Sequence, residues 1–521
     1  MTVEQKKLKK LTKVTQQDLD EGVWDAEHKG LYSKDGKRFL KYVRPKDLER
    51  GARDSFTFKP GVEVICEKAF SGPFSPLTSF VIPKSVVAIG DEAFQQMKLP
   101  QHGSITITKG LKYIGHDIFG GTHGILDVVF EEGITDIDLA KVLNFPAALT
   151  VFLPSTLKSI GDGGFGGMEV SHIHLADGNK YFCLEDGVLY DYAKTILLKC
   201  PVTKRGVLKI PEGVTTIVAN AFRLSGWQDA IDAEPEPKLT VILPQSLKKI
   251  EVGAFRHTWI DSLYIPANVA EIAEAAFDNP IHLSIEVSPD NEFFEVRNNL
   301  LINKREKKVL LGMTNDIEIP DDIKEIGDYA LTHLEAKSIV IPEGTTRIGH
   351  HNLNLSTMMQ MNLPSSLKEI SRSSFWGSSF YEKLPVIVVP SGMGEFFKEI
   401  IYDYGDYDIS SYIREIPDCL KISDDGKTVI GVYDQFILSI EIPFGIEVIG
   451  ERAFEGCILL REVTLPDSVK YIKSRAFNKC KYLSKIELPE HLLEIDDFAF
   501  SNCEFLGPLD IPHSVQKRGI W

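Results

Sequence analysis

The chain has 521 residues, of which 43% are hydrophobic and 25% charged, and its formal net charge is -16. This composition argues against a disordered chain, and the acidic charge argues against nucleic-acid binding and against tight docking on anionic lipid. The length exceeds what a single hydrophobic core usually serves, so the chain has either several domains or a repeat array whose core grows with its length.

The N-terminal segment, MTVEQKKLKKLTKVTQQDLD, is polar throughout. It contains lysines but no apolar run and no small-residue cleavage site, so it lacks the features of a signal peptide. No later stretch approaches the roughly 20 apolar residues that a membrane span needs. We therefore expect a cytoplasmic protein without membrane insertion, or a surface or secreted protein if a leader has been removed. Residues 1–26 are expected to form a flexible leader, with a short capping helix as the alternative, before an N-terminal hairpin or cap at 27–60.

A repeat begins near Gly61 and continues to the end of the chain. Most units share a short alternating run ending in Ile/Leu-Pro, then Leu/Val, then Ile, then Ala-Phe, as in EVTLPDSVKYIKSRAFNKC, and a few units are degenerate. In the last units Phe454, Phe477 and Phe500 lie 23 residues apart. The alternation predicts a strand with one buried face, and proline ends it because proline cannot donate to a ladder. Stacked units would share a continuous core and form a parallel sheet.

This pattern resembles the BspA-type leucine-rich repeats of bacteria and some protists. The resemblance implies a repeat solenoid of leucine-rich-repeat type that is mainly β. Such a solenoid has one short parallel strand per unit of about 23 residues, together with interspersed β-hairpins, turns and short helical segments. The resemblance also implies an alternative function, which is adhesion of a surface protein to host matrix or to other cells.

Four segments depart from the repeat and match one another as hairpins, with two apolar runs around a polar turn. They lie at 30–43, 179–201, 291–313 and 419–438. Residues 386–416 are expected to form a strand and a helix that close a main array at 61–416. Residues 417–521 would then form a hairpin and a second, shorter array. The chain ends partway through a unit, which predicts a cap, a covering chain or a truncation, and makes self-association through this end possible.

Seven cysteines in a chain of this length do not suggest a disulfide framework. Cys457, Cys480 and Cys503 recur at one slot of the repeat, 23 residues apart. This spacing predicts a buried column of small hydrophobic side chains rather than a metal or redox site.

The outward residues of the central strands form the predicted binding face. The residue before each Ile/Leu-Pro pair, and the residue two earlier, should point away from the core, because side chains alternate along a strand. In the middle of the array these positions carry apolar and aromatic groups, which often mark interaction surfaces. The predicted binding residues are Val129, Phe152, His172, His174, Lys209, Ile242 and Tyr264. The alternatives are that hairpins or loops cover this stripe, or that the strand positions are misassigned by one residue.

Motifs of catalysis and metal binding are scarce in the sequence. His172 and His174 share a face, but no spacing rule makes Asp127 or Asp177 a further metal ligand. The glycine-rich segment at 161–168 lacks the Lys-Ser/Thr of a phosphate loop, and the chain contains no GxSxG and no HExxH. We therefore expect a non-enzymatic scaffold without metal or cofactor that binds a protein partner. A carbohydrate-binding module and a self-assembling structural protein are further alternatives.

Overall fold

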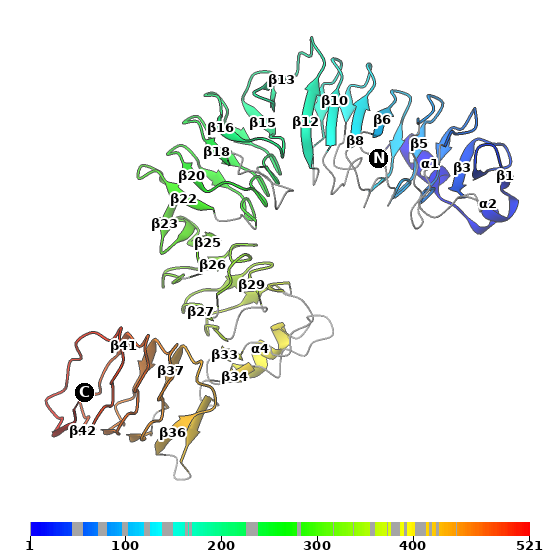
Figure 1. The fold of residues 1–521 in the computed structure, drawn as a ribbon. Helices are drawn as coiled ribbons and strands as arrows, with labels where there is room; N and C mark the ends of the chain where they lie inside the picture. Colours follow the sequence, from blue (N-terminus) through cyan, green and yellow to red (C-terminus); the bar gives the residue numbers. More distant parts are fainter. Residues whose placement is uncertain are drawn as a thin grey trace. The chain divides into compact units, whose positions relative to one another are not determined.

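The chain forms two compact units, Met1–Phe293 and Phe294–Trp521. In each unit short strands from successive turns stack in parallel, which confirms the predicted solenoid of leucine-rich-repeat type (Figure 1). The computed structural model describes residues 2–43, 56–70, 81–95, 103–118, 126–137, 149–161, 165, 169–225, 238–278, 283–315, 317–336, 338–354, 360–371, 373–376, 386–389, 393–401, 413–415, 419–423, 427–443 and 445–520. Most of the glycine-rich segment at 161–168 lies outside these residues.

Four six-stranded sheets share one design. Each begins with antiparallel strands of a hairpin and continues with parallel two-residue strands, one from each following turn. The first sheet contains β1 (Val23–Asp25), β2 (Gly30–Tyr32), β3 (Arg38–Tyr42), β4 (Val64–Ile65), β5 (Ala88–Ile89) and β7 (Tyr113–Ile114). The second contains β13 (Phe182–Glu185), β14 (Val188–Asp191), β15 (Ile196–Lys199), β17 (Thr216–Ile217), β19 (Lys249–Ile250) and β21 (Glu271–Ile272).

The third and fourth sheets repeat this design in the second unit. The third contains β23 (Phe294–Arg297), β24 (Leu300–Asn303), β25 (Lys308–Gly312), β26 (Glu325–Ile326), β28 (Arg347–Ile348) and β31 (Glu369–Ile370). The fourth contains β35 (Leu420–Ile422), β36 (Thr428–Val432), β38 (Val448–Ile449), β40 (Tyr471–Ile472), β42 (Glu494–Ile495) and β43 (Lys517–Arg518). All four predicted hairpins are therefore present.

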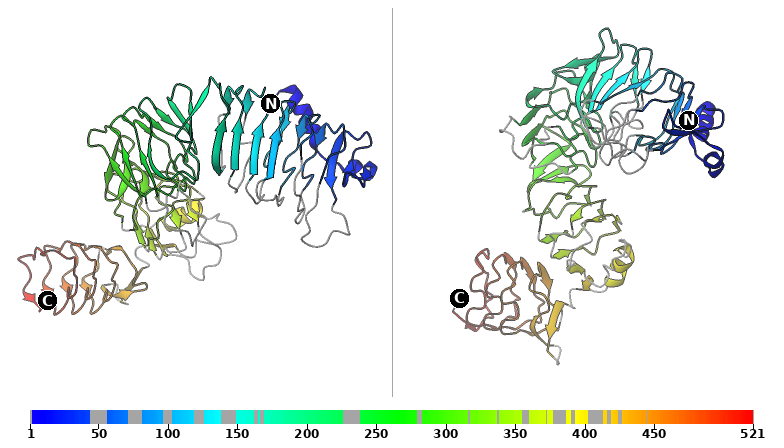
Figure 2. Two further views of the ribbon diagram at one scale, coloured as in Figure 1. Left: turned by 45° about the horizontal axis from the view of Figure 1, so that its top comes forward. Right: turned by 45° about the vertical axis from the view of Figure 1, so that its right-hand side comes forward.

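The alternating runs before Ile/Leu-Pro form a second set of parallel sheets, whose strands lie side by side in both views of Figure 2. In the first unit these are β6 (Gly103–Ile107), β8 (Leu126–Phe130), β10 (Leu149–Leu153) and β12 (Val170–Leu175), then β16 (Gly206–Lys209) with β18 (Leu239–Ile242), and β20 (Ser262–Ile265) with β22 (Ser284–Val287). In the second unit these are β27 (Ser338–Val340), β30 (Gln360–Asn362), β33 (Val386–Val389) and β34 (Ile413–Glu415), then β37 (Ser439–Glu441), β39 (Glu462–Thr464) and β41 (Lys485–Ile486). Two short pairs complete the strands: β9 (Asp136–Ile137) with β11 (Ser159–Ile160), and β29 (Leu353–Asn354) with β32 (Phe375–Trp376).

Aromatic columns fill the core between these sheets. Phe454, Phe477 and Phe500 stack with centroid distances of 5.0 and 5.3 Å, and Phe222 stacks on Phe255 at 4.8 Å. The Ala-Phe slot of the repeat is buried at these positions, because each ring packs on the ring of the next turn.

The cysteine column is also as predicted. Cys457 and Cys480 are buried and Cys503 is half-buried, and the Cys480 and Cys503 thiols each lie 3.2 Å from a carbonyl oxygen of the preceding turn. Burial raises the pKa of the Cys457 thiol to about 12 and that of Cys503 to about 11, so these groups stay protonated and act as packing residues.

The N-terminal segment is a packed helix rather than a flexible leader. Helix α1 (Val3–Thr12) begins with a capping box of Thr2 and Gln5 and contacts β4, β5 and β7. Leu8 and Thr12 are buried, and Leu8 packs with Val64, Ala88 and Tyr113 of these strands. The helix is followed by α2 (Gln16–Glu21), and Arg38 of β3 donates to the Leu11 carbonyl at 3.0 Å. The capping-helix alternative therefore describes this segment.

The segment 386–416 contains the predicted strand and helix, β33 and α4 (Gly394–Ile401). Phe397 of α4 is buried with Ile387 of β33 and Ile413 of β34 in one core cluster. The boundaries proposed for the main and the second array remain predictions.

Candidate functional site

The predicted binding residues lie on the outward side of their strands. Burial alternates along β18 and β20, so Ile242 and Tyr264 are each 46% exposed while the neighbouring Val241 is buried. The same alternation in β12 exposes His172 and His174. A misassignment by one residue is therefore wrong for these strands.

Three of these residues form one column on the sheet of β6, β8, β10 and β12. Val129 stands opposite Phe152, and Phe152 stands opposite His174. The Phe152 and His174 rings stack with centroids 4.6 Å apart and planes at 9°. The half-buried Phe152 ring therefore covers one face of the exposed His174 ring.

His172 lies in the neighbouring column and is separated from Asp127 by Thr150. Among the residues that the structure describes, no three His, Cys, Asp or Glu side chains gather where they could hold a metal ion. The column thus places Asp127 two strands from His172 rather than beside it.

The remaining predicted residues lie on two smaller sheets. Lys209 of β16 stands opposite Ile242 of β18, and Tyr264 of β20 stands opposite Glu286 of β22. Strand β18 also contacts β20. Val207, on the same face of β16, is 66% exposed. Within the described residues, this part of the predicted stripe is open to solvent rather than covered by the hairpins.

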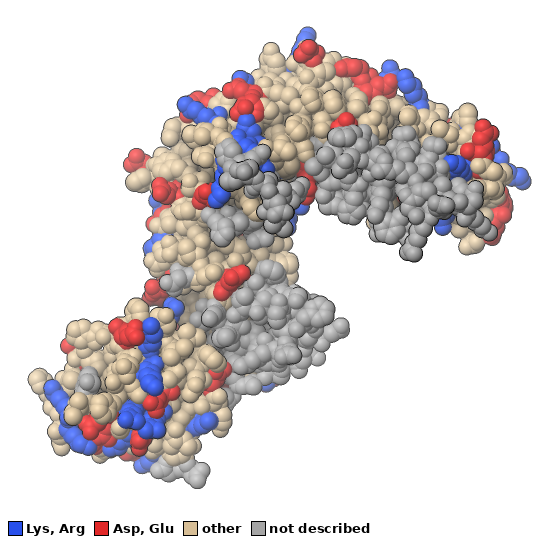
Figure 3. All heavy atoms as spheres, viewed as in Figure 1, with Lys and Arg blue, Asp and Glu red and all other residues tan. Residues whose placement is uncertain are grey.

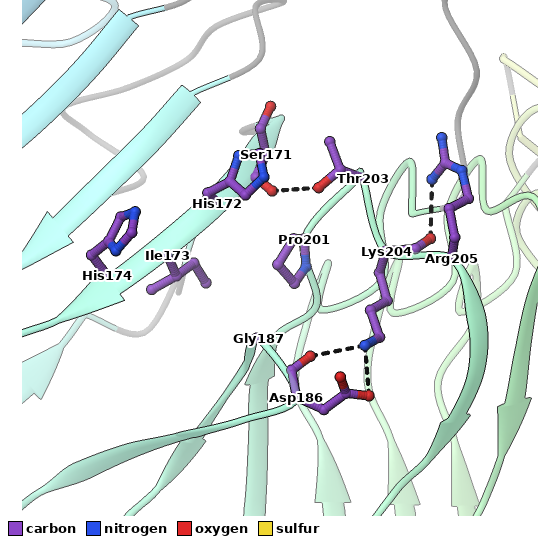
Figure 4. A pocket seen from close by; sticks show the side chains of 10 residues that line it. All are labelled: Ser171, His172, Ile173, His174, Asp186, Gly187, Pro201, Thr203, Lys204 and Arg205. Atoms are coloured by element: carbon purple, nitrogen blue, oxygen red, sulfur yellow. Dashed lines mark hydrogen bonds and ion pairs between the residues drawn. The ribbon is translucent and has the colours of Figure 1, made fainter. Parts of the chain in front are cut away.

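A cleft of about 340 Å³ lies at the edge of the sheet of β6, β8, β10 and β12, between β12 and the loop that follows β15 (Figure 4). Strand β12 contributes Ser171 to His174 on one side, and the loop contributes Pro201, Thr203, Lys204 and Arg205 on the other. The turn between β13 and β14, Asp186–Gly187, also lines the cleft. The cleft thus joins the first group of predicted residues to the hairpin insertion.

An ion pair holds this cleft together. The Lys204 ammonium lies 2.6 Å from the Asp186 carboxylate and donates to the Asp186 carbonyl at 2.9 Å (Figure 4). The Arg205 guanidinium donates to the Val202 and Lys204 carbonyls. The sequence prediction missed these cleft residues, although the Asp-Gly pair is a common hairpin turn and the Lys-Arg pair follows the hairpin directly.

Lys199, at the end of β15, is wholly buried. Its ammonium donates to the Asn220 carbonyl at 3.1 Å, and burial lowers its pKa to about 7, with the neighbouring Arg223 charge acting in the same direction. The sequence prediction missed this residue too. The available signal was its position two residues after the buried Leu197, on the apolar side of the strand.

None of the described helices has the length and apolarity needed for a membrane span. A comparison with curated protein sequences finds no match.

Several solved structures are similar to this chain. A leucine-rich repeat protein from Eubacterium ventriosum is 19% identical, with 91% of this chain and 92% of that chain covered and a TM-score of 0.36. The pneumococcal vaccine antigen PcpA is 16% identical, with coverage of 74% and 92% and a TM-score of 0.35. A leucine-rich cell surface protein from Faecalibacterium prausnitzii is 18% identical, with coverage of 94% of both chains and a TM-score of 0.24.

The family assignment comes from the sequence rather than from these structures. The model of the BspA type leucine-rich repeat region matches in six copies, over residues 54–185, 236–297, 312–403 and 433–520. These residues are more than half of the chain, and they carry most of the Ile/Leu-Pro and Ala-Phe slots that form the strands and the aromatic columns. The chain belongs to the BspA-type leucine-rich repeat family.

Proposed function

We propose that the chain is a non-enzymatic scaffold that binds a partner protein through the outward face of its central strands. The observation that carries this proposal is the exposure of apolar side chains on neighbouring strands of β16, β18 and β20. Val207, Ile242 and Tyr264 are 66%, 46% and 46% exposed. Exposed apolar groups that lie together often mark protein interfaces, and tyrosine is enriched among the residues that dominate binding energy.

The frame below this face is suited to rigid display. Val241 and Leu263 alternate with the exposed residues and are buried, so each outward side chain projects from a strand that the core holds in place. A preformed surface loses little conformational entropy on binding, so more of the contact energy appears as affinity.

The C-terminal turns provide a contrast that supports the choice of face. There the outward Lys485 and Glu462 form an ion pair at 2.7 Å, and Thr464 is the exposed neighbour. Figure 3 shows Lys and Arg beside Asp and Glu over these turns. Paired and solvated charges of this kind contribute little to binding, so the central face is the better candidate.

The test is affinity capture with the purified chain, followed by a binding titration with the captured partner. The variant Ile242→Ala/Tyr264→Ala is expected to weaken partner binding by roughly 30-fold or more, because it removes two side chains of the kind that dominate interfaces. The matched control is Ile430→Ala/Tyr433→Ala, which removes the same residue types, 56% and 72% exposed, from the β36 hairpin.

Equal loss of binding in both variants, or no loss in the first, contradicts the choice of face. The identity of the partner also tests the alternatives that the sequence leaves open. A matrix or cell-surface partner would support adhesion, and a glycan ligand would support the carbohydrate-binding alternative. Concentration-dependent mass by light scattering tests self-association.

A further inference from the structure

The central face consists of the outward residues of β16, β18 and β20, and β22 extends it (Figure 1). Strand β16 pairs in parallel with β18, and β20 pairs in parallel with β22. Strands β18 and β20 are joined just before they begin, where the Lys238 ammonium lies 2.8 Å from the Asp261 carboxylate. They are joined again just after they end, where the Asn268 amide donates to the Gln245 carbonyl at 2.8 Å. The outward side chains therefore form columns that run across all four strands.

One of these columns has opposite charges at its two ends. Lys209 stands opposite Ile242, and Tyr264 stands opposite Glu286. Ile242 and Tyr264 occupy the same slot of the repeat, directly before Leu-Pro and Ile-Pro, so they are neighbours in the column. All four side chains are exposed. The column therefore consists of a cation, an aliphatic group, an aromatic group and an anion, in that order.

The two charges of this column are unpaired. Within the described residues, neither the Lys209 nor the Glu286 side chain forms an ion pair or a hydrogen bond. The outward charges of the C-terminal turns differ, because Lys485 and Glu462 neutralise one another at 2.7 Å. Lys209 and Glu286 are thus available for charged groups of another molecule, and such groups fix the orientation in which two proteins associate.

The column is complementary to itself. A second copy can lie face to face with the first, related by a two-fold axis parallel to the strands, and its column then runs in the reverse direction. Lys209 lies opposite Glu286 of the second copy, and Ile242 lies opposite Tyr264 of the second copy. A two-fold axis along the column would instead place each Lys209 on its own equivalent, which the repulsion of like charges opposes.

The neighbouring column allows two such faces to approach. It consists of four exposed residues with short side chains: Val207, Thr240, Ser262 and Ser284. The axis parallel to the strands places Val207 opposite Ser284 and Thr240 opposite Ser262. No charge and no bulky group of this column therefore meets its equivalent in the second copy.

We propose that the central face binds a second copy of this chain, and that the two copies form a face-to-face dimer about a two-fold axis parallel to β18 and β20. This inference rests on the proposed function, since it names the protein that the central face binds. Each copy has a net charge of -16, so two copies repel one another and a contact without complementary groups is opposed. Ile242 and Tyr264 of both copies, flanked by the symmetry-related Lys–Glu pairs, stabilise the dimer against this repulsion.

The test is the mass of the purified full chain as a function of concentration, measured by sedimentation equilibrium. We expect a dimer that dissociates on dilution, and a chain that stays monomeric overturns the proposal. Lys209→Glu and Glu286→Lys should each weaken the dimer by roughly tenfold or more, because each replaces both Lys–Glu pairs by pairs of like charge. The matched control is Glu441→Lys, which makes the same change of charge at the same slot in the exposed end of β37, and it should leave the dimer unchanged.

Exchange of the charges tests the axis. The double variant Lys209→Glu/Glu286→Lys reverses the column and should restore the dimer. An equimolar mixture of the two single variants should form a mixed dimer, because their columns carry opposite charges. Circular dichroism checks that each variant is folded, which we expect for substitutions of exposed side chains. Unchanged dimerisation of both single variants, or failure of the double variant or of the mixture to restore the dimer, overturns the proposal.

Two outcomes separate this inference from the proposed function. If the wild-type chain is a monomer and captures a different protein that Ile242→Ala/Tyr264→Ala loses, the proposed function stands and this inference fails. If the chain forms a dimer that Ile242→Ala/Tyr264→Ala retains, the copies meet through another surface, so this inference fails and the capture experiment alone decides the proposed function. Loss of the dimer in Ile242→Ala/Tyr264→Ala, together with restoration by charge exchange, supports both.

Discussion

The two hairpin insertions at 179–201 and 291–313 have the same frame but different chemistry. In the first, the Asn179 amide donates to the Pro154 and Leu157 carbonyls at 3.1 and 3.0 Å. In the second, the Asn291 amide donates to the Pro266 and Val269 carbonyls at 2.9 and 3.0 Å. A buried asparagine thus anchors the start of each insertion to the preceding turn in the same way.

The differences lie at residues that this frame does not determine. Lys199 pairs with Leu189 in the first insertion, and Leu311 pairs with Leu301 at the equivalent position of the second. Both side chains are fully buried. One core position therefore holds an amine in one insertion and an apolar group in the other.

The turns of the two hairpins are also held differently. In the first hairpin Lys204 binds the turn residue Asp186, whereas in the second the Asn298 amide donates to the Glu318 carbonyl at 3.1 Å. The comparison teaches that the insertion supplies a scaffold, and that a few substitutions at its turn and its last strand decide whether it contributes a charged cleft.

The largest expected effect comes from exchanging the buried apolar residue for the amine. Leu311→Lys should lower the free energy of unfolding by about 4 kcal/mol at neutral pH, because a charged amine is desolvated in the core. Urea unfolding followed by circular dichroism measures the loss. Leu311→Met is the control and should lose less than about 1.5 kcal/mol. Equal stability of the two variants would show that this site tolerates an amine as well as the first insertion does.

The two buried asparagines that anchor the insertions should contribute equally to the free energy of unfolding. Asn179→Ala and Asn291→Ala are each expected to lower the free energy of unfolding by about 2–3 kcal/mol, because each leaves buried carbonyl groups without their hydrogen-bond donor. The control Asn268→Ala removes one exposed hydrogen bond, from the Asn268 amide to the Gln245 carbonyl, and should change the free energy of unfolding little. A clear difference in the free energy of unfolding between Asn179→Ala and Asn291→Ala would show that the two insertions are not anchored equivalently.

The reverse exchange should stabilise the first unit. Lys199→Leu is expected to raise the free energy of unfolding by about 2 kcal/mol at pH 7, because it removes the desolvation of a buried amine. The folded-state pKa is lowered to about 7 from 10.5, so between these values the unfolded state binds more protons and the stability of the wild-type chain rises with pH. Unfolding curves across this window should show that the difference in free energy of unfolding between the variant and the wild-type chain narrows as pH rises. A difference that does not change with pH would mean that Lys199 keeps its proton in the folded chain across this window, and would contradict the lowered pKa.

The smallest effect concerns the hairpin turns. Both turns have two residues with positive φ: Asp186 (50°) and Gly187 (78°) in the first, and Asn298 (51°) and Asn299 (59°) in the second. Asn299→Gly gives the second turn the Asn-Gly pair that such turns prefer, and should stabilise the hairpin by about 0.5 kcal/mol. Hydrogen exchange of the hairpin amides measures this change. The reciprocal Gly187→Asn should increase exchange in the first hairpin, and a decrease would contradict the argument.

Local patterns were sufficient to predict most of the fold. Alternation before Ile/Leu-Pro places the outward residues, such as Ile242 and Tyr264, and the slot spacing places the Phe and Cys columns. These features depend on residues within one repeat and on the same positions of the next repeat. The pattern of one repeat therefore predicts the others.

The cleft could not be predicted in the same way. It depends on where the turn at Asp186–Gly187 lies relative to β12 and to Lys204, and no periodic pattern determines that placement. The contact of α1 with β4, β5 and β7 is also tertiary, and its polar sequence favoured a flexible tail. Lys199 was missed for another reason, since a lysine that ends an apolar strand is usually solvated.

The four six-stranded sheets have a mechanical consequence. Each starts at a hairpin, and within the described residues none shares a strand with the next. Under tension applied to the two termini, the parallel strands of one sheet would part in succession until the ladder ended at the next hairpin, where rupture has to begin again. The hairpins would then divide the extension of the chain into discrete steps, each as long as the stretch of sequence between two insertions.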